Sequence, residues 1–351
     1  MVVFYNTKLY LHSLVWCSLL ICLSSGFSTK KSVSPSEGEQ DLGLFQQWMK
    51  QHGRIYSNSE ESEARYDIFR RNLKYIRETN SRRSKSPSGY HLGLNKFADM
   101  SPEEFRQMYL HPLEMPATTI GRSDYVQQDD SCAPPATWDW RKQGVVTEVK
   151  NQQSCGSCWA FAATGAMESI HAISTGKLFR LSEQELVDCD TSSHGCAGGW
   201  SHYAFEWVIQ NGGISEEDNY PYVAQKGACK ANMHDGDKVV KISKYTQVPQ
   251  SDDALKCATS KQPVTVAFNA TDLQFYEGGI YDGENCPKDS TGVTHIALIV
   301  GYDSKDGTDY WIVKNSWGDT WGMNGYFFIQ RNTNLPNGVC SLNAWAYVPN
   351  I

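Results

Sequence analysis

The chain has 351 residues, of which 40% are hydrophobic and 20% are charged, and its formal net charge at pH 7 is −7. This length allows a large core and more than one domain, and the composition is that of a globular protein rather than of a disordered or fibrous one. The charge gives no indication of a nucleic-acid partner, which would require a basic patch or stripe.

Residues 1–28 have the pattern of a secretory signal peptide. Lys8 precedes a mostly apolar run over 9–23, and the small residues of SSGFS follow it. A membrane anchor is the alternative, but the run is shorter than the roughly 18 to 20 apolar residues that span a bilayer, and His12 and two serines interrupt it. We therefore expect the mature protein to enter the secretory pathway without a membrane span. Its expected location is a vacuole-like or lysosome-like compartment or the extracellular space.

The remaining chain divides into two units that differ in cysteine content and in charge. Residues 29–130 contain no cysteine and carry 15 basic and 15 acidic side chains. Residues 131–351 contain nine cysteines and carry 16 basic against 24 acidic side chains, a net charge of −8. This contrast suggests two units that persist for different lengths of time after synthesis.

One segment of the first unit is strongly basic. Tyr66, Phe69, Leu73 and Ile76 recur at spacings of three and four, which predicts an amphipathic helix. The basic residues of this helix are Arg65, Arg70, Arg71, Lys74, Arg77, Arg82, Arg83 and Lys85. A solvated helix face is the usual explanation of such a charge run. Because the second unit on the same chain is acidic, we favour docking of the basic face onto it.

Residues 111–135 connect the two units. This segment, HPLEMPATTIGRSDYVQQDDSCAPP, shows neither helical nor strand periodicity. Its content of Pro, Ser, Thr and Asp predicts an exposed linker, the kind of segment in which proteolytic cleavage concentrates. We place the first residue of the mature protein between Val126 and Ala133.

The second unit combines a helix with later strands. A helix that ends at Gly176 is predicted from an apolar stripe formed by Trp159, Ala162, Ala163, Ala166, Ile170 and Ile173. Strands are predicted over 264–268, 294–302, 310–317 and 325–331. Helices followed by strands favour an α+β fold with two packed lobes.

The stretch NQQSCGSCWAF, residues 151–161, contains two cysteines three positions apart, Cys155 and Cys158. A redox motif or a zinc site could use such a pair. However, the chain lacks the βαβ alternation of redox proteins and the second, suitably spaced pair of a zinc site. Cys17 and Cys22 belong to the signal peptide, so nine cysteines remain. An odd number in an exported protein implies a free thiol or an intermolecular bridge.

Cys158 is the candidate for a reactive thiol. It precedes the predicted Ala-rich helix, and the unpaired amides and dipole of a helix N-terminus favour a thiolate. His295, 137 residues downstream, can supply a cationic partner. Asn315 can accept the imidazole N–H without adding charge, and Gln152 offers an amide NH₂ to a developing oxyanion. These four residues indicate nucleophilic catalysis.

The sequence resembles the papain family of cysteine proteases in its plant form. The family's motifs occur here in the family's order as QQSCGSCWAF, THIALIVGY, KNSWG and WGMNGYFFI. The first unit is similar to the family's inhibitory prosegment. Its helical signature matches at Glu61, Arg65, Phe69, Asn72, Ile76 and Asn80, and its second motif at Gly93, Asn95, Phe97 and Asp99.

The resemblance implies a papain-like two-lobed α+β fold, with a helical left lobe and a β-barrel-like right lobe, preceded by a helical inhibitory prosegment. The implied domains are a signal peptide (1–28), an inhibitory propeptide (29–130) and a peptidase domain (131–351). The implied function is a cysteine endopeptidase that is made as an inactive precursor and activated by acid-triggered removal of the propeptide. Expected partners are protein and peptide substrates, the protein's own propeptide and cystatin-like inhibitors. A monomer without metal or cofactor is expected.

The resemblance also implies roles for single residues. Cys158 would be the nucleophile, His295 the general acid and base, and Asn315 the residue that orients the histidine. Gln152 and the backbone N–H of Cys158 would form the oxyanion hole. Trp317 would shield the Asn–His hydrogen bond from water.

Substrate-binding positions can be carried over in the same way. Gly198 and Gly199 would offer backbone groups to an extended substrate, where a side chain would block close approach. The pocket for the second residue before the cleaved bond maps onto Trp200, Ser201, Ala267, Val293, Ile296 and Trp345. Ile296 and Trp345 are bulkier than the family's usual residues at these positions, so we expect a shallow pocket that prefers Val, Ala or Pro over Phe and Arg.

Three disulfides are implied by the resemblance, namely Cys155–Cys196, Cys189–Cys229 and Cys286–Cys340. Cys132 and Cys257 lie outside this common set, and we expect them to form a fourth. Cys158 would then be the only free thiol, which resolves the odd count. Asn269, in the sequence NAT, fits an N-glycosylation acceptor.

A storage or ligand-recognition protein of the same fold is the alternative function. GGIYDGENC and the region around Cys132 look similar to a legume seed and vacuolar subgroup of thiol-protease-like proteins. Some members of this subgroup have lost the nucleophile. Here the nucleophile, the base, the orienting asparagine and the oxyanion amide are all present, which favours an active peptidase.

Overall fold

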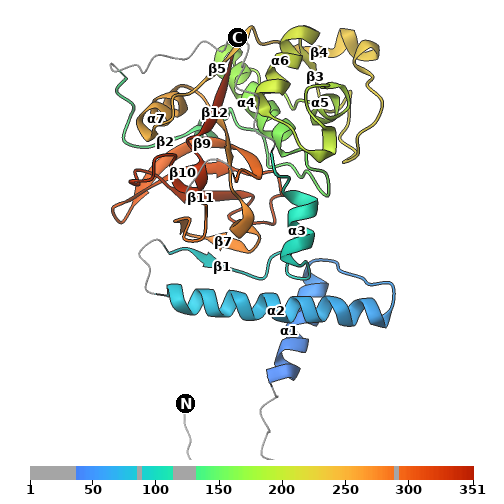
Figure 1. Cartoon of the computed structure of the whole chain (residues 1–351). Coiled ribbons are helices and arrows are strands. Elements are labelled where there is room, and N and C mark those ends of the chain that lie inside the picture. Colours follow the sequence, from blue (N-terminus) through green and yellow to red (C-terminus); the bar gives the residue numbers. More distant parts are fainter. Residues whose placement is uncertain (1–36, 85–88, 114–131, 288–291) are drawn as a thin grey trace, which may run out of the picture.

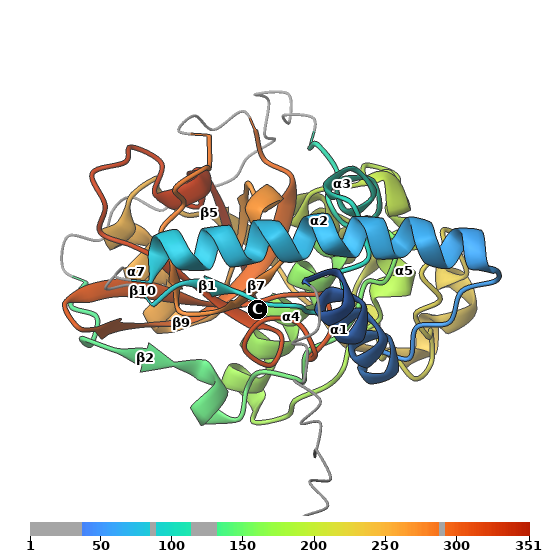
Figure 2. The ribbon, with the colours of Figure 1, turned by 90° about the horizontal axis from the view of Figure 1, so that it is seen from below.

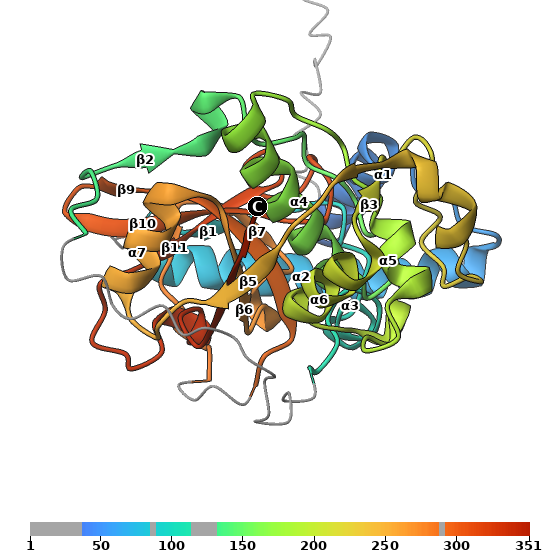
Figure 3. The ribbon, with the colours of Figure 1, turned by 90° about the horizontal axis from the view of Figure 1, so that it is seen from above.

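The computed structural model describes residues 37–84, 89–113, 132–287 and 292–351 (Figure 1). The signal peptide expected at 1–28, and residues 114–131 of the linker with Val126, lie outside the described residues. The N-terminal helical unit, which the resemblance implies is a propeptide and which is called so below, lies at one end of the molecule, and a helical lobe and a sheet lobe lie beside each other beyond it (Figures 1 and 3). The expected α+β class is confirmed. No helix in the described part of the chain is both long and apolar enough to cross a membrane.

The propeptide is built around one long helix. Its elements are α1 (Glu37–Gln51), α2 (Ser59–Arg83), β1 (His91–Leu92) and α3 (Pro102–Tyr109). The predicted basic helix is part of α2, which begins earlier than the apolar pattern indicated because the Asn58 side chain accepts the N–H of Glu61 and caps it. A small core joins α1 to α2 and contains Phe45, Trp48, Phe69 and Leu73. The propeptide therefore has a core of its own.

The helical lobe surrounds the predicted Ala-rich helix. Its elements are α4 (Cys158–Thr175), α5 (Glu183–Cys189), η2 (Gly195–Ala197), α6 (Ser201–Asn211), β3 (Ile214–Ser215), η3 (Ala231–Asp237) and β4 (Lys238–Val240). Helix α4 ends at Gly176, whose φ of 75° lies in the left-handed region that glycine adopts readily. Gly165 of α4 faces Leu298 of the sheet lobe, and a Cβ there would lie 3.0 Å from that leucine. This close approach packs the two lobes together.

The sheet lobe contains an eight-stranded sheet in the order β5-β12-β6-β9-β10-β11-β8, with β2 paired to β9. Its strands are β2 (Trp138–Asp139), β5 (Lys244–Gln247), β6 (Val264–Phe268), β8 (Ile280–Tyr281), β9 (His295–Lys305), β10 (Thr308–Lys314), β11 (Tyr326–Gln330) and β12 (Trp345–Asn350). The other elements of this lobe are η1 (Trp140–Gln143), α7 (Asp252–Lys261), η4 (Thr271–Leu273), β7 (Tyr276–Gly278) and η5 (Val339–Ser341). All but one of the described pairings in the eight-stranded sheet are antiparallel, the exception being β11 with β8.

The end of β10 differs from the sequence prediction of a strand over 310–317. The strand ends at Lys314, so Asn315 follows it instead of lying on it. The backbone N–H of Gln152 donates to the carbonyl of Ser316 at 2.8 Å. The chain therefore leaves the sheet at this point and joins the loop that precedes α4, which brings the two lobes together at the site.

Four disulfides are present, and they have the pairings that the sequence analysis expected. They are Cys132–Cys257, Cys155–Cys196, Cys189–Cys229 and Cys286–Cys340. Cys158 is the free cysteine of the described residues and is buried. Disulfides form and persist in oxidising compartments, so the protein is one of the secretory pathway.

The propeptide docks mainly through backbone pairing and apolar contacts. Strand β1 pairs with β7 of the sheet lobe, with His91 opposite Gly278 and Leu92 opposite Tyr276. Apolar side chains of the propeptide join the core of that lobe and include Tyr90, Leu92, Phe97 and Phe105. Helix α2 runs beneath both lobes (Figure 2). The propeptide thus shares a core with the domain it covers.

The expected docking of the basic face occurs in part, at the C-terminal end of α2. Among the described residues of α2, ion pairs to the sheet lobe come from Arg82 and Arg83, which face Asp282 and Glu284. Arg65, Arg70, Lys74 and Arg77 pair with acidic residues of the propeptide itself. The physical reason is that the apolar stripe of α2 faces inward, so most of the basic face remains in solvent.

Candidate active site

Helix α4 places the thiol of Cys158 at its first turn. The backbone N–H groups of Cys158, Trp159 and Ile296 point at the sulfur and favour its ionised form. Cys158 is buried, with 3% of its surface exposed. Burial raises the pKa of the thiol to about 11, which outweighs the effect of these N–H groups.

His295 and Asn315 meet where β9 begins and β10 ends. His295 Nε2 lies 2.8 Å from Asn315 Oδ1, which also accepts the N–H of Ser316. Asn315 Oδ1 is therefore an acceptor, and Nε2 is the nitrogen of His295 that carries the proton. The imidazole lies between the rings of Phe268 and Trp317, at centroid distances of 5.7 and 4.8 Å. These contacts hold the ring in place and leave Nδ1 as the nitrogen that can exchange a proton with a thiol.

The expected thiolate–imidazolium pair is not favoured in this precursor. Burial lowers the pKa of His295 to about 4, although the hydrogen bond to Asn315 acts in the opposite direction. Burial also raises the pKa of Cys158, so it shifts both groups toward their neutral forms. The cause is the loss of water from both groups beneath the propeptide, which disfavours either charged form.

Gln152 lies at the position expected for an oxyanion donor. Its Oε1 accepts a hydrogen bond from Ser316 Oγ at 2.7 Å, which fixes the amide so that Nε2 is the donor. Nε2 is 2.9 Å from the carbonyl oxygen of Cys155 and 3.4 Å from that of Tyr109 in the propeptide. A propeptide carbonyl therefore already lies within reach of the amide that would stabilise an oxyanion.

The end of the described propeptide runs through the substrate positions. The N–H of His111 donates to the carbonyl of Thr294, and that of Leu113 donates to the carbonyl of Val293, each at 3.1 Å. A Cβ on Gly198 would lie 3.5 Å from His111 and 3.7 Å from Leu113. Gly198 therefore contacts an extended strand, as the sequence analysis expected for a substrate.

Gly199 has a different environment from the one expected. A Cβ at this position would collide with the side chains of Ser193 and Trp159. Its requirement for glycine therefore comes from packing inside the helical lobe.

Five of the predicted pocket residues belong to the same large apolar cluster as Leu113. The members of this cluster that the sequence analysis named are Trp200, Ala267, Val293, Ile296 and Trp345. The rings of Trp200 and Trp345 meet edge to face, with centroids 5.4 Å apart. Ser201 is buried, and its hydroxyl lies 2.9 Å from that of Thr265. Trp345 therefore packs on Trp200, another of the predicted pocket residues.

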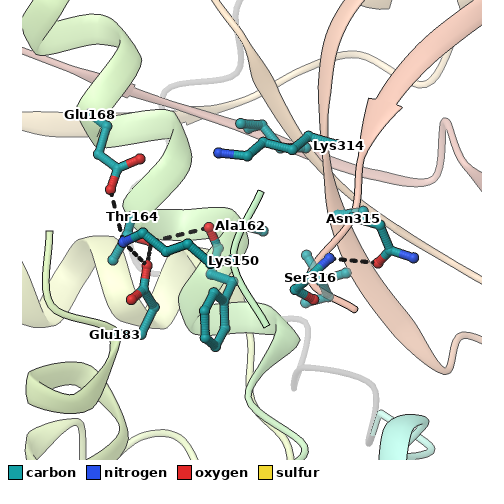
Figure 4. Close-up of a pocket in the computed structure, with 12 residues that line it drawn as sticks. Lys150, Ala162, Thr164, Glu168, Glu183, Lys314, Asn315 and Ser316 are labelled. Carbon is teal, nitrogen blue, oxygen red and sulfur yellow. Dashed lines mark hydrogen bonds and ion pairs between the residues drawn. The ribbon is translucent and has the colours of Figure 1, made fainter. Parts of the chain in front are cut away.

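A group of buried charges behind the site was missed by the sequence analysis. Lys150 Nζ lies 2.7 Å from Glu183 and 3.2 Å from Glu168, and Lys314 Nζ donates to Thr147 at 2.8 Å (Figure 4). The two lysines and the two glutamates line a cavity of about 20 Å³, with Asn315 and Ser316 on its other side. Burial raises the pKa of Glu183 to about 7 in spite of Lys150. The sequence feature that could have indicated this group of buried charges is Lys314, the lysine at the end of the otherwise apolar segment YWIVK.

Asn269, the expected glycosylation acceptor, is 8% exposed. Its Nδ2 donates to the carbonyl of Gly292, and its Oδ1 accepts the N–H of Thr271. The nitrogen that would carry a glycan is therefore occupied inside the folded protein. This packing does not favour glycosylation of the folded chain.

Comparisons with known proteins agree with this geometry. A family model described as papain family cysteine protease matches residues 134–350, and one described as cathepsin propeptide inhibitor domain (I29) matches residues 45–105. The P34 probable thiol protease of Glycine max is 47% identical over 92% of this chain and 85% of its own length. A recombinant stem bromelain precursor covers 89% of this chain and 99% of its own, with a TM-score of 0.81 and 38% identity. Procathepsin L2 from Tenebrio molitor covers 89% of this chain and 100% of its own, with a TM-score of 0.82 and 39% identity.

Proposed function

Because the chain belongs to the papain family of cysteine proteases and is the inactive precursor of a cysteine endopeptidase, we propose that Cys158, His295, Asn315 and Gln152 perform its peptide hydrolysis. The observation that carries this assignment is the hydrogen bond of 2.8 Å between His295 and Asn315, with Gln152 bound to the adjacent Ser316 and the Cys158 sulfur bound by the N–H of Ile296, next to His295. The experiment that tests it is removal of the Cys158 sulfur, followed by an assay of peptide hydrolysis.

The proposed reaction begins once the propeptide has left and water has returned to the cleft. The Cys158 proton moves to His295 Nδ1, and the thiolate attacks the carbonyl carbon of the peptide bond. The carbonyl oxygen becomes an oxyanion that accepts hydrogen bonds from Gln152 Nε2 and the N–H of Cys158. His295 gives its proton to the leaving amine as the C–N bond breaks. It then deprotonates a water molecule that hydrolyses the thioester and releases the carboxylate.

We propose that the precursor divides into a propeptide at 29–130 and a peptidase domain at 131–351. The family matches at 45–105 and 134–350 support this division, as does the cysteine-free composition of the first part. The mature enzyme is proposed to act as a monomer in a vacuole-like or lysosome-like compartment or outside the cell. Cystatin-like inhibitors are proposed to occupy the cleft that the propeptide strand occupies here.

Acid-triggered release is the proposed mode of activation, and His111 is the group that would respond first. Burial lowers the pKa of His111 in the docked propeptide below its ordinary value of about 6.5. As the pH falls through that value, a released propeptide gains a proton that the docked one resists, so docking weakens. Replacing His111 by Gln should therefore move the pH at which the precursor processes itself to a lower value, as measured by gel analysis between pH 4 and pH 7.

A control variant and a second titrating group help to interpret this experiment. His91 is an exposed histidine of the same propeptide, and His91→Gln should leave the processing profile unchanged. Burial raises the pKa of Glu104, but the Ser101 N–H and Arg65 outweigh it and hold the pKa below its usual range. The stabilisation from the Arg65–Glu104 pair is therefore lost only as the pH falls through that lowered value. A His111→Gln profile identical to wild type would exclude the histidine as the trigger.

We propose that the pocket around Leu113 selects small or branched aliphatic side chains at the second residue before the cleaved bond. The contact between Trp200 and Trp345 supports a shallow pocket. None of the predicted wall residues is acidic, so an arginine of the substrate would find no ion-pair partner among them. Each methylene that does not fit should cost about 1–3 kcal/mol in discrimination. Val, Ala or Pro should therefore give a higher kcat/KM than Phe or Arg in peptides that differ only there.

The matched variant for this pocket is Trp345→Ser. It opens the far end of the pocket without changing the catalytic residues, so preference should shift toward Phe. A clear preference of the unmodified enzyme for Phe would contradict the shallow pocket.

A further inference from the structure

The hydroxyl of Tyr222 connects two segments that flank the proposed oxyanion hole. Tyr222 lies in the loop between β3 and η3, and its hydroxyl donates to the backbone carbonyl of Gln152 at 2.8 Å. The same hydroxyl is 2.6 Å from Ser157 Oγ. A tyrosine hydroxyl has one hydrogen, so the Ser157 hydroxyl must be the donor in the second contact. The result is a series of two hydrogen bonds, in which Ser157 donates to Tyr222 and Tyr222 donates to Gln152.

These hydrogen bonds matter because of the position of Ser157. Ser157 is the N-cap residue of α4, where a serine hydroxyl normally accepts an N–H from the first turn. Here its side chain makes no capping hydrogen bond. The Ser157 hydroxyl is bound to Tyr222 instead, so it does not accept hydrogen bonds from the backbone N–H groups around Cys158.

The other end of this series of hydrogen bonds is the carbonyl of a strained peptide unit. Tyr222 binds the carbonyl of the peptide unit that joins Gln152 to Gln153, and Gln153 has a φ of 54°. This left-handed conformation costs free energy for a residue that has a side chain, and it persists only where the surrounding structure holds it. Gln152 and Ser157 are both fully buried, with no measurable exposure. In the precursor, the tyrosine hydroxyl therefore binds partners that are shielded from solvent.

We propose that Tyr222 is a positioning residue that sets the spacing of the two oxyanion donors, the side-chain amide of Gln152 and the backbone N–H of Cys158. This inference rests on the proposed function, because it acts through those two donors. The ring of Tyr222 packs edge to face on Phe161 of α4 at 4.9 Å, which fixes the hydroxyl relative to the helix that carries Cys158. Ser316 holds the far end of the Gln152 side chain, so Tyr222 supplies the corresponding restraint on its backbone.

The test compares Tyr222→Phe with Tyr220→Phe in the mature enzyme. Tyr220 lies in the same loop and is buried, and its hydroxyl donates to Asp188 and not to the oxyanion segment. Tyr222→Phe should lower kcat about 10-fold or more, since loss of a whole oxyanion donor costs about 10²–10³-fold. KM should change less than about twofold, because the pocket around Trp200 is untouched. Tyr220→Phe should leave both parameters unchanged.

Two inhibitors separate positioning from a merely structural role. A peptide aldehyde forms a tetrahedral adduct whose oxygen occupies the oxyanion hole, so its affinity should fall with kcat in Tyr222→Phe. Alkylation of Cys158 by iodoacetamide needs the thiolate but no oxyanion hole, so its rate should stay unchanged. An unchanged kcat, or an equal loss of aldehyde affinity and alkylation rate, would overturn the proposal. Should Tyr222→Phe fail to fold, Ser157→Ala breaks the same series of hydrogen bonds from its other end and should show the same selective loss.

A third variant distinguishes failure of this inference from failure of the proposed function. Gln152→Ala removes the proposed donor itself and should lower both kcat and aldehyde affinity. If Gln152→Ala changes neither, the oxyanion assignment is wrong, and the role of Tyr222 is wrong with it. If Gln152→Ala lowers both and Tyr222→Phe lowers neither, only the positioning role is excluded.

Discussion

Replacement of Cys158 by Ala should abolish peptide hydrolysis while leaving peptide binding intact. The sulfur is the nucleophile in the proposed reaction, and loss of a nucleophile that acts as a unit with its base lowers kcat by about 10⁴-fold or more. The pocket around Leu113 and the hydrogen-bonding carbonyls of Val293 and Thr294 do not depend on the sulfur. Hydrolysis of a fluorogenic peptide measures the loss, and competition by an unlabelled peptide measures binding.

This variant cannot process itself, so its propeptide must be removed by tagged wild-type enzyme that is then withdrawn. Ser154→Ala is the matched control, since Ser154 is an exposed residue of the same loop. It should retain full activity after the same treatment. Substantial peptidase activity of Cys158→Ala above the level of residual tagged enzyme would refute the assignment.

Removal of the propeptide should increase the reactivity of the Cys158 thiol by several orders of magnitude. In the precursor, burial raises the pKa of this thiol to about 11, so at pH 7 about one molecule in 10⁴ carries the thiolate. In the mature enzyme, water, the N-terminus of α4 and His295 all favour ionisation. Alkylation by iodoacetamide at pH 7 should therefore be at least about 10³-fold faster in the mature enzyme.

The pH dependence separates ionisation from simple steric protection. A thiol with a raised pKa gains thiolate as the pH rises, so precursor alkylation should increase about tenfold per pH unit between pH 7 and pH 10. The mature enzyme should show a plateau across neutral pH. Cys158→Ser reports labelling elsewhere, because the other cysteines of the described residues are in disulfides. A pH-independent rate in the precursor would show that only access, and not ionisation, is controlled.

The chemistry of the site could be predicted from sequence because it depends on residue types at fixed places in local motifs. Cys158 stands at the start of a predicted helix, and His295 and Asn315 stand in two distinctive motifs. The structure brings His295 and Asn315 within hydrogen-bond distance and places Gln152 beside Ser316. The boundary of β10 was predicted less well, because hydrophobic periodicity continues past the residue at which the chain leaves the sheet.

The propeptide shows where sequence reasoning overreached. The charge run on α2 indicated docking by its whole basic face, but charge alone does not say which face of a helix turns inward. Burial of the apolar stripe decided the orientation, and Arg82 and Arg83 alone among the described basic residues of α2 reach acidic residues of the sheet lobe.

The sequence by itself indicated the family and the odd cysteine, and it supplied the candidate catalytic residues that we propose. Only the tertiary structure decided the ionisation of Cys158 and His295 in the precursor, the burial of Lys150 with Glu168 and Glu183, and the link from Tyr222 to Gln152. The physical reason is that these properties depend on which groups lose contact with water and which distant segments replace it. Residue identity and spacing specify the groups, but folding specifies their surroundings.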